Sequence, residues 1–190
     1  MTAQRAVLVV VDMQNGFVND RSRHVIPAVV ELVDRWLDAG RDVVFSRYYN
    51  YPGSPFERMI KWSALQSSPE IDIIPELADR AARAHTVLDK KTYTVFSNEG
   101  ASLVERAGWT DLVFCGIATE SCVLKSAVDA FERDLTPWIV TDACASHGGG
   151  DAHAAGLLVA KRFIGGGQLI SSTSPKAGPG PQVDRATVLD

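Results

Sequence analysis

The segment Ala6–Val11 constrains the fold of this chain more than any other. Its sequence AVLVVV is a continuous apolar run dominated by β-branched valine. Because successive side chains of a strand point to opposite faces, a run that is apolar at every position needs cover on both sides. Such strands occur in parallel sheets that lie between two layers of helices. The segment therefore predicts an α/β fold.

Strand-like and helix-like segments alternate along the rest of the chain. Pro27 opens a helix with apolar residues at helical spacing, and Gly40 ends it. The alternation predicts a three-layer α/β/α sandwich, Rossmann-like, with a mostly parallel six-stranded sheet. The other expected strands are 42–46, 86–89, 111–115, 137–141 and 168–171, and the other expected helices are 100–107, 119–133 and 151–163. Residues 71–77 form only an apolar patch in a long connection.

The length of the chain fits one domain. At 190 residues it can bury most of its apolar surface in a single core. We expect the domain to span residues 1–173. Residues 174–190 are rich in Pro, Gly and polar side chains, which predicts a C-terminal arm or a disordered tail.

Charge and composition exclude several classes of partner. The net charge is −4 and no block of Lys or Arg stands out, which argues against nucleic acid or an anionic membrane. No signal-peptide pattern and no apolar stretch of membrane-span length occurs, so we expect a cytoplasmic protein. The three cysteines lack CxxC spacing, which fits neither a disulfide scaffold nor a zinc site.

Three chemically useful residues follow the expected strands. The ligand crevice of an open parallel sheet lies beyond the carboxyl ends of its strands. Asp12 follows the first strand, Lys90 the third, and Cys122 lies in the loop and helix after the fourth. Lys91 is adjacent to Lys90, so one lysine points into the crevice and the other to solvent. The pattern does not decide which.

Their placement suggests nucleophilic catalysis. Cys122 lies in the first turn of a helix for which Thr119 is a candidate N-cap, and a helix N-terminus stabilises a thiolate and a developing oxyanion. Asp12 could accept the thiol proton, and a lysine would keep that carboxylate ionised. The structural alternatives are a buried core thiol at Cys122 and an Asx-turn or cap at Asp12.

Three segments resemble the isochorismatase-like hydrolases, which include nicotinamidases and N-carbamoyl amidases. They are DMQNGF from Asp12, KKTYTVF from Lys90 and GIATESCV from Gly116, and the resemblance extends over residues 7–171. In the family's lysine motif the catalytic lysine precedes a phenylalanine by six residues, which selects Lys90 over Lys91. The resemblance implies an Asp12–Lys90–Cys122 triad.

The resemblance also implies the surroundings of the nucleophile. A non-proline cis peptide is expected between Ile117 and Ala118, with the backbone N–H groups of Ala118 and Cys122 forming an oxyanion hole. The expected substrate pocket is lined by Gln14, Phe17, Tyr48, Trp62 and Thr119. Alternatives remain for three of them: a loop hydrogen bond for Gln14, a core aromatic for Phe17, and a hydrophobic anchor of the long loop rather than a lid for Trp62.

Two differences from relatives refine the prediction. Metal-binding nicotinamidases carry an Asp-x-His motif after the second strand, where this chain has Tyr48, Tyr49 and Asn50, so we expect neither a metal nor another cofactor. True isochorismatases lack the nucleophilic cysteine that this chain has at Cys122.

The sequence therefore predicts a metal-independent cysteine hydrolase, an amidohydrolase that cleaves a small amide or carbamoyl-type C–N bond through a Cys122 thioester. The alternatives are an enol-ether hydrolase of the isochorismatase type with Asp12 as acid, and a catalytically silent binding protein on the same fold. The expected partners are a small-molecule substrate and, as in relatives, further copies of the chain in a dimer or tetramer.

Overall fold

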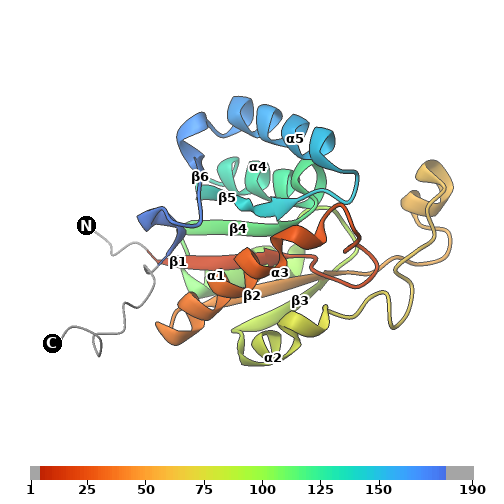
Figure 1. Cartoon of the computed structure of the whole chain (residues 1–190), viewed down its shortest axis with the longest axis horizontal. Coiled ribbons are helices and arrows are strands. Elements are labelled where there is room, and N and C mark those ends of the chain that lie inside the picture. Colours follow the sequence, from red (N-terminus) through yellow and green to blue (C-terminus); the bar gives the residue numbers. More distant parts are fainter. Residues whose placement is uncertain (1–4, 179–190) are drawn as a thin grey trace, which may run out of the picture.

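A single parallel sheet organises the molecule (Figure 1). The computed structural model describes residues 5–178. Its six strands lie in the order β3-β2-β1-β4-β5-β6, and all neighbouring pairs are parallel. The strands are β1 (Ala6–Val11), β2 (Val43–Tyr48), β3 (Thr86–Lys90), β4 (Asp111–Ile117), β5 (Thr136–Ala145) and β6 (Leu169–Ile170). The predicted strand positions and the three-layer α/β/α architecture are confirmed.

Helices cover both faces of this sheet. Helices α1 and α2 pack against each other on one face, and α3, α4 and α5 cover the other (Figure 1). The α-helices are α1 (Ile26–Asp38), α2 (Pro75–Arg83), α3 (Asn98–Ala107), α4 (Leu124–Phe131) and α5 (Gly150–Phe163). The short helical turns are η1 (Arg23–Val25), η2 (Phe56–Ile60), η3 (Thr119–Val123), η4 (Gly166–Gln168) and η5 (Pro175–Ala177).

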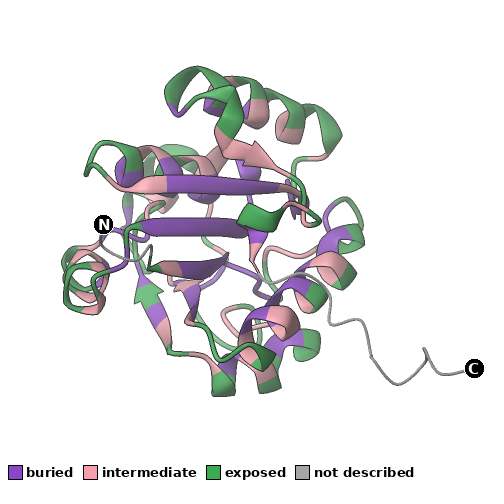
Figure 2. Ribbon diagram, turned by 90° about the vertical axis from the view of Figure 1, so that its left-hand side faces the viewer, coloured by how far each residue is buried: buried purple, intermediate pink, exposed green. Residues whose placement is uncertain are grey.

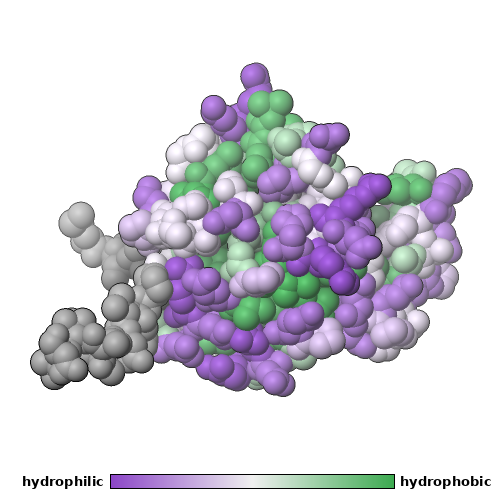
Figure 3. Space-filling model, in the orientation of Figure 1, coloured by the Kyte–Doolittle hydropathy of each residue, from purple (hydrophilic) through white to green (hydrophobic). Residues whose placement is uncertain are grey.

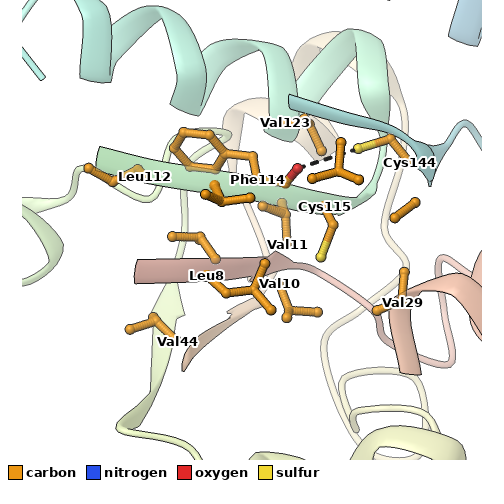
Figure 4. Packing of buried hydrophobic residues seen from close by; sticks show 14 of the residues in the cluster. Leu8, Val10, Val11, Val29, Val44, Leu112, Phe114, Cys115, Val123 and Cys144 are labelled. Atoms are coloured by element: carbon orange, nitrogen blue, oxygen red, sulfur yellow. Dashed lines mark hydrogen bonds between the residues drawn. The ribbon is translucent and has the colours of Figure 1, made fainter. Parts of the chain in front are cut away.

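The core forms where the apolar patterns predict it. The central strands are buried and the helices expose their outer faces (Figure 2). Helix α1 turns an apolar stripe at helical spacing onto the sheet, made of Val29, Leu32, Val33 and Trp36. Cys115 and Cys144 lie among these core side chains, and the Cys144 thiol donates to the carbonyl of Phe114 at 3.9 Å (Figure 4). Burial raises the pKa of Cys144 to about 12, so both thiols serve packing.

Three elements differ from the sequence prediction. Helix α2 was expected only as an apolar patch, because it buries just Leu77 and Ala81 in an otherwise charged segment. Strand β5 runs further than predicted, past a register shift against β4 between Phe114 and Gly116. The predicted helix 119–133 divides into the π-helical turn η3 and the regular helix α4.

The C-terminal end of the described chain packs on α1. The Trp36 indole N–H donates to the carbonyl of Ala177 at 2.7 Å, and Ala177 is fully buried. The start of the segment assigned to a tail, residues 174–178, thus belongs to the packed domain. The remainder of the predicted arm, residues 179–190, lies outside the described residues. Within residues 5–178, no helix has the length and apolar character needed to cross a membrane.

Candidate active site

The structure brings Asp12, Lys90 and Cys122 together at the carboxyl edge of the sheet. The Lys90 ammonium lies 2.6 Å from Oδ2 of Asp12, and neither side chain is exposed to solvent. The Cys122 thiol lies beside both of them, and the charges of Asp12 and Lys90 both act on its pKa. An acid, a cation and a thiol from three separate crossover units therefore form one contiguous buried cluster.

Asp12 is held by backbone and side-chain contacts at the end of β1. Its φ is +48°, a left-handed conformation that Asp tolerates better than most residues and that is frequent at functional sites. Ser46 on β2 donates its hydroxyl to Oδ1 of Asp12 at 2.7 Å. Since Lys90 contacts Oδ2, both carboxylate oxygens have partners. Ser46 was not predicted, because a serine within a strand carries no distinguishing pattern.

Lys90 uses all three of its donors inside the protein. Besides Asp12, its ammonium donates to the carbonyls of Thr92 at 3.0 Å and Tyr93 at 3.1 Å. Burial lowers the pKa of Lys90, but the charges of Asp12 and Cys122 outweigh that effect, so its pKa lies above the ordinary value. Lys91 is exposed, with its ammonium over the ring of Tyr51. The pair diverges, with Lys90 on the crevice side.

Cys122 lies in the π-helical turn η3 rather than in a regular first turn. Burial raises the pKa of its thiol above the ordinary value; Lys90 lowers that pKa and Asp12 raises it. A buried thiol with a raised pKa needs a neighbouring base before it can act as a nucleophile, and the Asp12 carboxylate is the acidic group beside Cys122.

A buried serine ties the nucleophile turn to the lysine loop. The Ser126 hydroxyl donates to the carbonyl of Cys122 at 2.7 Å and accepts from the N–H of Val95 at 3.1 Å. The loop that it fixes also supplies the carbonyls of Thr92 and Tyr93 to Lys90. Ser126 thus sets the position of Cys122 relative to Lys90. It was not predicted as a site residue from the sequence.

The backbone entering η3 is tightly constrained. The peptide bond between Ile117 and Ala118 is cis. Gly116 has a φ of +109°, and a Cβ there would lie 2.2 Å from the carbonyl oxygen of Val11, so only glycine fits. The predicted N-cap role of Thr119 is wrong: Ala118 occupies the cap position and no side chain caps the turn.

A pocket of about 330 Å³ opens above Cys122. Its walls come mainly from the long connection after β2 and from the loops after β1, β3, β4 and β5. Aromatic side chains dominate, and Phe17 stacks on both Trp62 and His147. The lining residues are Phe17, Tyr48, Phe56, Ile60, Lys61, Trp62, Tyr93, Ala118, Ser121, Cys122 and His147. Phe17, Tyr48 and Trp62 were predicted for this wall and lie in it.

Two residues predicted for the pocket wall lie elsewhere. Gln14 is fully buried and bonds backbone on both sides, accepting from the N–H of Tyr48 and donating to the carbonyls of Tyr48 and Ile71. Thr119 turns away from the pocket to His153 on α5, with 2.8 Å between its hydroxyl and the ring Nδ1. The polar groups of both side chains form hydrogen bonds to neighbouring segments of the protein, and these bonds hold the loops in place.

On the loop after β2, the side chain of Asn50 is engaged with protein partners. The Asn50 amide donates to the carbonyls of Trp62 and Ala64, and its oxygen accepts from the Ser54 hydroxyl. Among the described residues, no group of three or more His, Cys, Asp or Glu side chains is placed to hold a metal ion.

Comparisons with known proteins show what this chain is similar to. The sequence model of one family, described as the Isochorismatase domain, matches residues 6–173. Ureidoacrylate amidohydrolase RutB of Acinetobacter baylyi is 26% identical over 199 residues, which span 87% of this chain and 80% of its own. A probable isochorismatase of Pseudomonas chlororaphis is 31% identical over 155 residues, spanning 75% of this chain and 72% of its own. The crystal structure of nicotinamidase PncA from Bacillus subtilis is similar with a TM-score of 0.78 at 21% identity, covering 88% of this chain and 100% of that one.

Proposed function

Because the chain belongs to the isochorismatase family of hydrolases, we propose that it is a metal-independent cysteine hydrolase of small amides or carbamoyl compounds. One observation carries the proposal: the Asp12 carboxylate contacts both Lys90 and the Cys122 thiol beneath an aromatic pocket. The RutB relative is named as an amidohydrolase, which agrees with cleavage of a C–N bond.

The first half-reaction forms a thioester. Asp12 takes the thiol proton, and the sulfur of Cys122 attacks the substrate carbonyl carbon. The carbonyl electrons move to the oxygen, which the backbone N–H groups of Ala118 and Cys122 stabilise as an oxyanion. Asp12 then passes its proton to the leaving nitrogen, the C–N bond breaks, and ammonia or an amine departs.

The second half-reaction restores the enzyme. Asp12 removes a proton from water, whose oxygen attacks the thioester carbonyl. The C–S bond breaks, the proton on Asp12 returns to the sulfur of Cys122, and the acid product leaves. Lys90 favours the ionised form of Asp12 between these steps and stabilises the transient thiolate. Catalysis by this scheme needs no group beyond the protein and water.

The test is ammonia release from a panel of primary amides, ureas and N-carbamoyl compounds. We expect Cys122→Ala to lose at least about 10³-fold in kcat/KM against wild type. Cys144→Ala is the matched control, because it removes a core thiol and leaves the pocket unchanged. A Cys122→Ala protein that turns over at the wild-type rate would refute covalent catalysis.

One relative supports a second candidate, hydrolysis of an enol ether with Asp12 as acid. The probable isochorismatase of Pseudomonas chlororaphis is 31% identical to this chain. On this reading Cys122→Ala stays active and Asp12→Asn does not. A catalytically silent protein would show no turnover in either assay, and its Cys122 would resist alkylation under conditions that modify a free thiol.

We also propose that the protein acts on a small molecule as a dimer or tetramer. The pocket volume of about 330 Å³ suits a small ligand. Light scattering coupled to size-exclusion chromatography tests the assembly, and a mass equal to one chain would contradict it.

A further inference from the structure

A second groove lies beside the active-site pocket. Its volume is about 460 Å³, and it is lined by α4 and by Phe163, the last residue of α5. Tyr93 and Ser121 line both this groove and the pocket above Cys122. The groove is therefore the outer neighbour of the active site, and the hydrolytic mechanism makes no use of it.

The two helices at this groove expose apolar side chains. Leu124 and Val128 on α4 are half-buried, and Phe131 at its end is 51% exposed. On α5, Leu158 is 65% and Phe163 is 57% exposed. Hydrophobic surface is visible over α5, at the top of the molecule (Figures 1 and 3). Exposed apolar side chains that gather on adjoining elements are typical of surfaces that bind another protein.

The outward side chains of α4 form one stripe along the helix. Leu124, Val128 and Phe131 are spaced by four and three residues, so they share one face. Lys125 and Glu132 are seven residues apart and flank this stripe near its two ends. The face therefore presents a cation, an apolar centre and an anion, in that order along the chain.

Both charged ends of the stripe are accessible to a partner. Lys125 pairs with Asp129 on its own helix, yet its side chain is 52% exposed. Glu132 is exposed and forms no ion pair within residues 5–178. It also occupies the C-cap of α4, where the helix macrodipole disfavours a negative charge. A cation from another chain would stabilise it there.

We propose that this face of α4 binds the same face of a second copy of the chain, with the two helices antiparallel about a two-fold axis at Val128. Leu124 lies four residues before the axis and Phe131 three after it, so each faces the other across the interface. Lys125 lies three residues before the axis and Glu132 four after it, so each lysine faces the partner's glutamate.

The symmetry of this pattern is the reason for choosing a second copy as the occupant. A two-fold interface needs a surface that complements itself, and the α4 face meets that condition in both its apolar centre and its charges. A surface for an unrelated protein needs no such symmetry. The inference assigns a surface to the dimer or tetramer proposed above, and it does not depend on turnover.

A charge exchange tests the antiparallel contact. Sedimentation equilibrium gives the dissociation constant of wild type, of Lys125→Glu, of Glu132→Lys and of an equimolar mixture of the two variants. Each variant alone should associate about 10–50-fold more weakly than wild type, because it sets two like-charge pairs across the axis. In the mixture every contact between positions 125 and 132 again joins opposite charges. Heterodimers should therefore form with nearly wild-type affinity, and native mass spectrometry identifies them by mass.

Further variants separate assembly from folding. Lys125→Glu also removes the pair with Asp129, so the thermal unfolding midpoint of each variant is measured as well. Glu132→Lys and Val128→Arg leave that pair intact, and Val128→Arg places two like charges at the axis and should leave single chains. Lys91→Glu is the matched control, since it reverses an exposed charge outside the groove and should not change the dissociation constant.

The outcomes distinguish this surface from the assembly and from the hydrolase. Weaker association of the single variants with recovery in the mixture supports the interface, and weakening without recovery overturns the antiparallel pairing. An oligomeric wild type that Val128→Arg and Glu132→Lys leave unchanged retains the assembly and overturns this surface. A wild type that remains a single chain at its highest soluble concentration overturns both. None of these results involves ammonia release, which tests the hydrolase separately.

Discussion

Removal of the Lys90 charge should destabilise the fold by a predictable amount. Lys90 and Asp12 are both inaccessible to solvent, with 2.6 Å between Nζ and Oδ2. Lys90→Met leaves the Asp12 carboxylate buried without its cation, while the Ser46 hydroxyl still donates to Oδ1. Breaking a buried ion pair on one side costs about 3–5 kcal/mol. That is a large part of the roughly 5–15 kcal/mol by which domains of this size are stable.

Urea unfolding followed by tryptophan fluorescence measures this loss. We expect Lys90→Met to lower the free energy of unfolding by about 3–5 kcal/mol. The double variant Asp12→Asn/Lys90→Met should recover about 2 kcal/mol of it, because the unpaired charge is gone. Lys91→Met, an exposed neighbour, should stay within about 0.5 kcal/mol of wild type. A Lys90→Met cost below about 1 kcal/mol, or no coupling between the two positions, would refute a buried ion pair.

Three further predictions follow from the same geometry. Ser126→Ala should lower the free energy of unfolding by about 1–3 kcal/mol, because the buried N–H of Val95 loses its acceptor. The variant should also shift the pH profile of Cys122 alkylation, and an unchanged profile would show that Ser126 does not position Cys122. Because the pKa of Lys90 is raised above 10.5, its stabilising contribution is complete below that pH and is lost as the pH rises through the raised value; unfolding titrations that show no decline there would contradict the ion pair. Gly116→Ala should prevent stable folding, because its Cβ would lie 2.2 Å from the carbonyl oxygen of Val11. Gly150→Ala is the control: its Cβ would meet nothing within 4 Å, so the midpoint of thermal unfolding should stay near that of wild type.

The sequence predicts those elements whose burial is visible in their side chains. Strand β1 is apolar throughout and was placed with its observed bounds. Helix α2 was missed because its two buried residues, Leu77 and Ala81, are set among charged ones. The extension of β5 depends on a register shift against β4, which is a property of the pair and leaves no mark on either segment.

The candidate site follows the same rule. Asp12 and Cys122 could be placed together because parallel strands end at one edge of the sheet. The assignments of Gln14 and Thr119 to the pocket failed because each side chain bonds a segment distant in sequence. Lys61 was not predicted as a pocket residue. It reaches the pocket wall through the left-handed turn after η2, and a lysine gives no sequence signal for such a turn.

Interception of the Cys122 thioester is the most direct test of the proposed mechanism. A substrate found in the ammonia-release panel is mixed with the enzyme, and the reaction is quenched with acid at successive times. Mass spectrometry then gives the mass of the peptide that contains Cys122. We expect an acyl or carbamoyl adduct on Cys122 that forms and decays as fast as turnover, and neither adduct nor turnover in Cys122→Ala. Turnover without an adduct, together with an active Cys122→Ala protein, would contradict it.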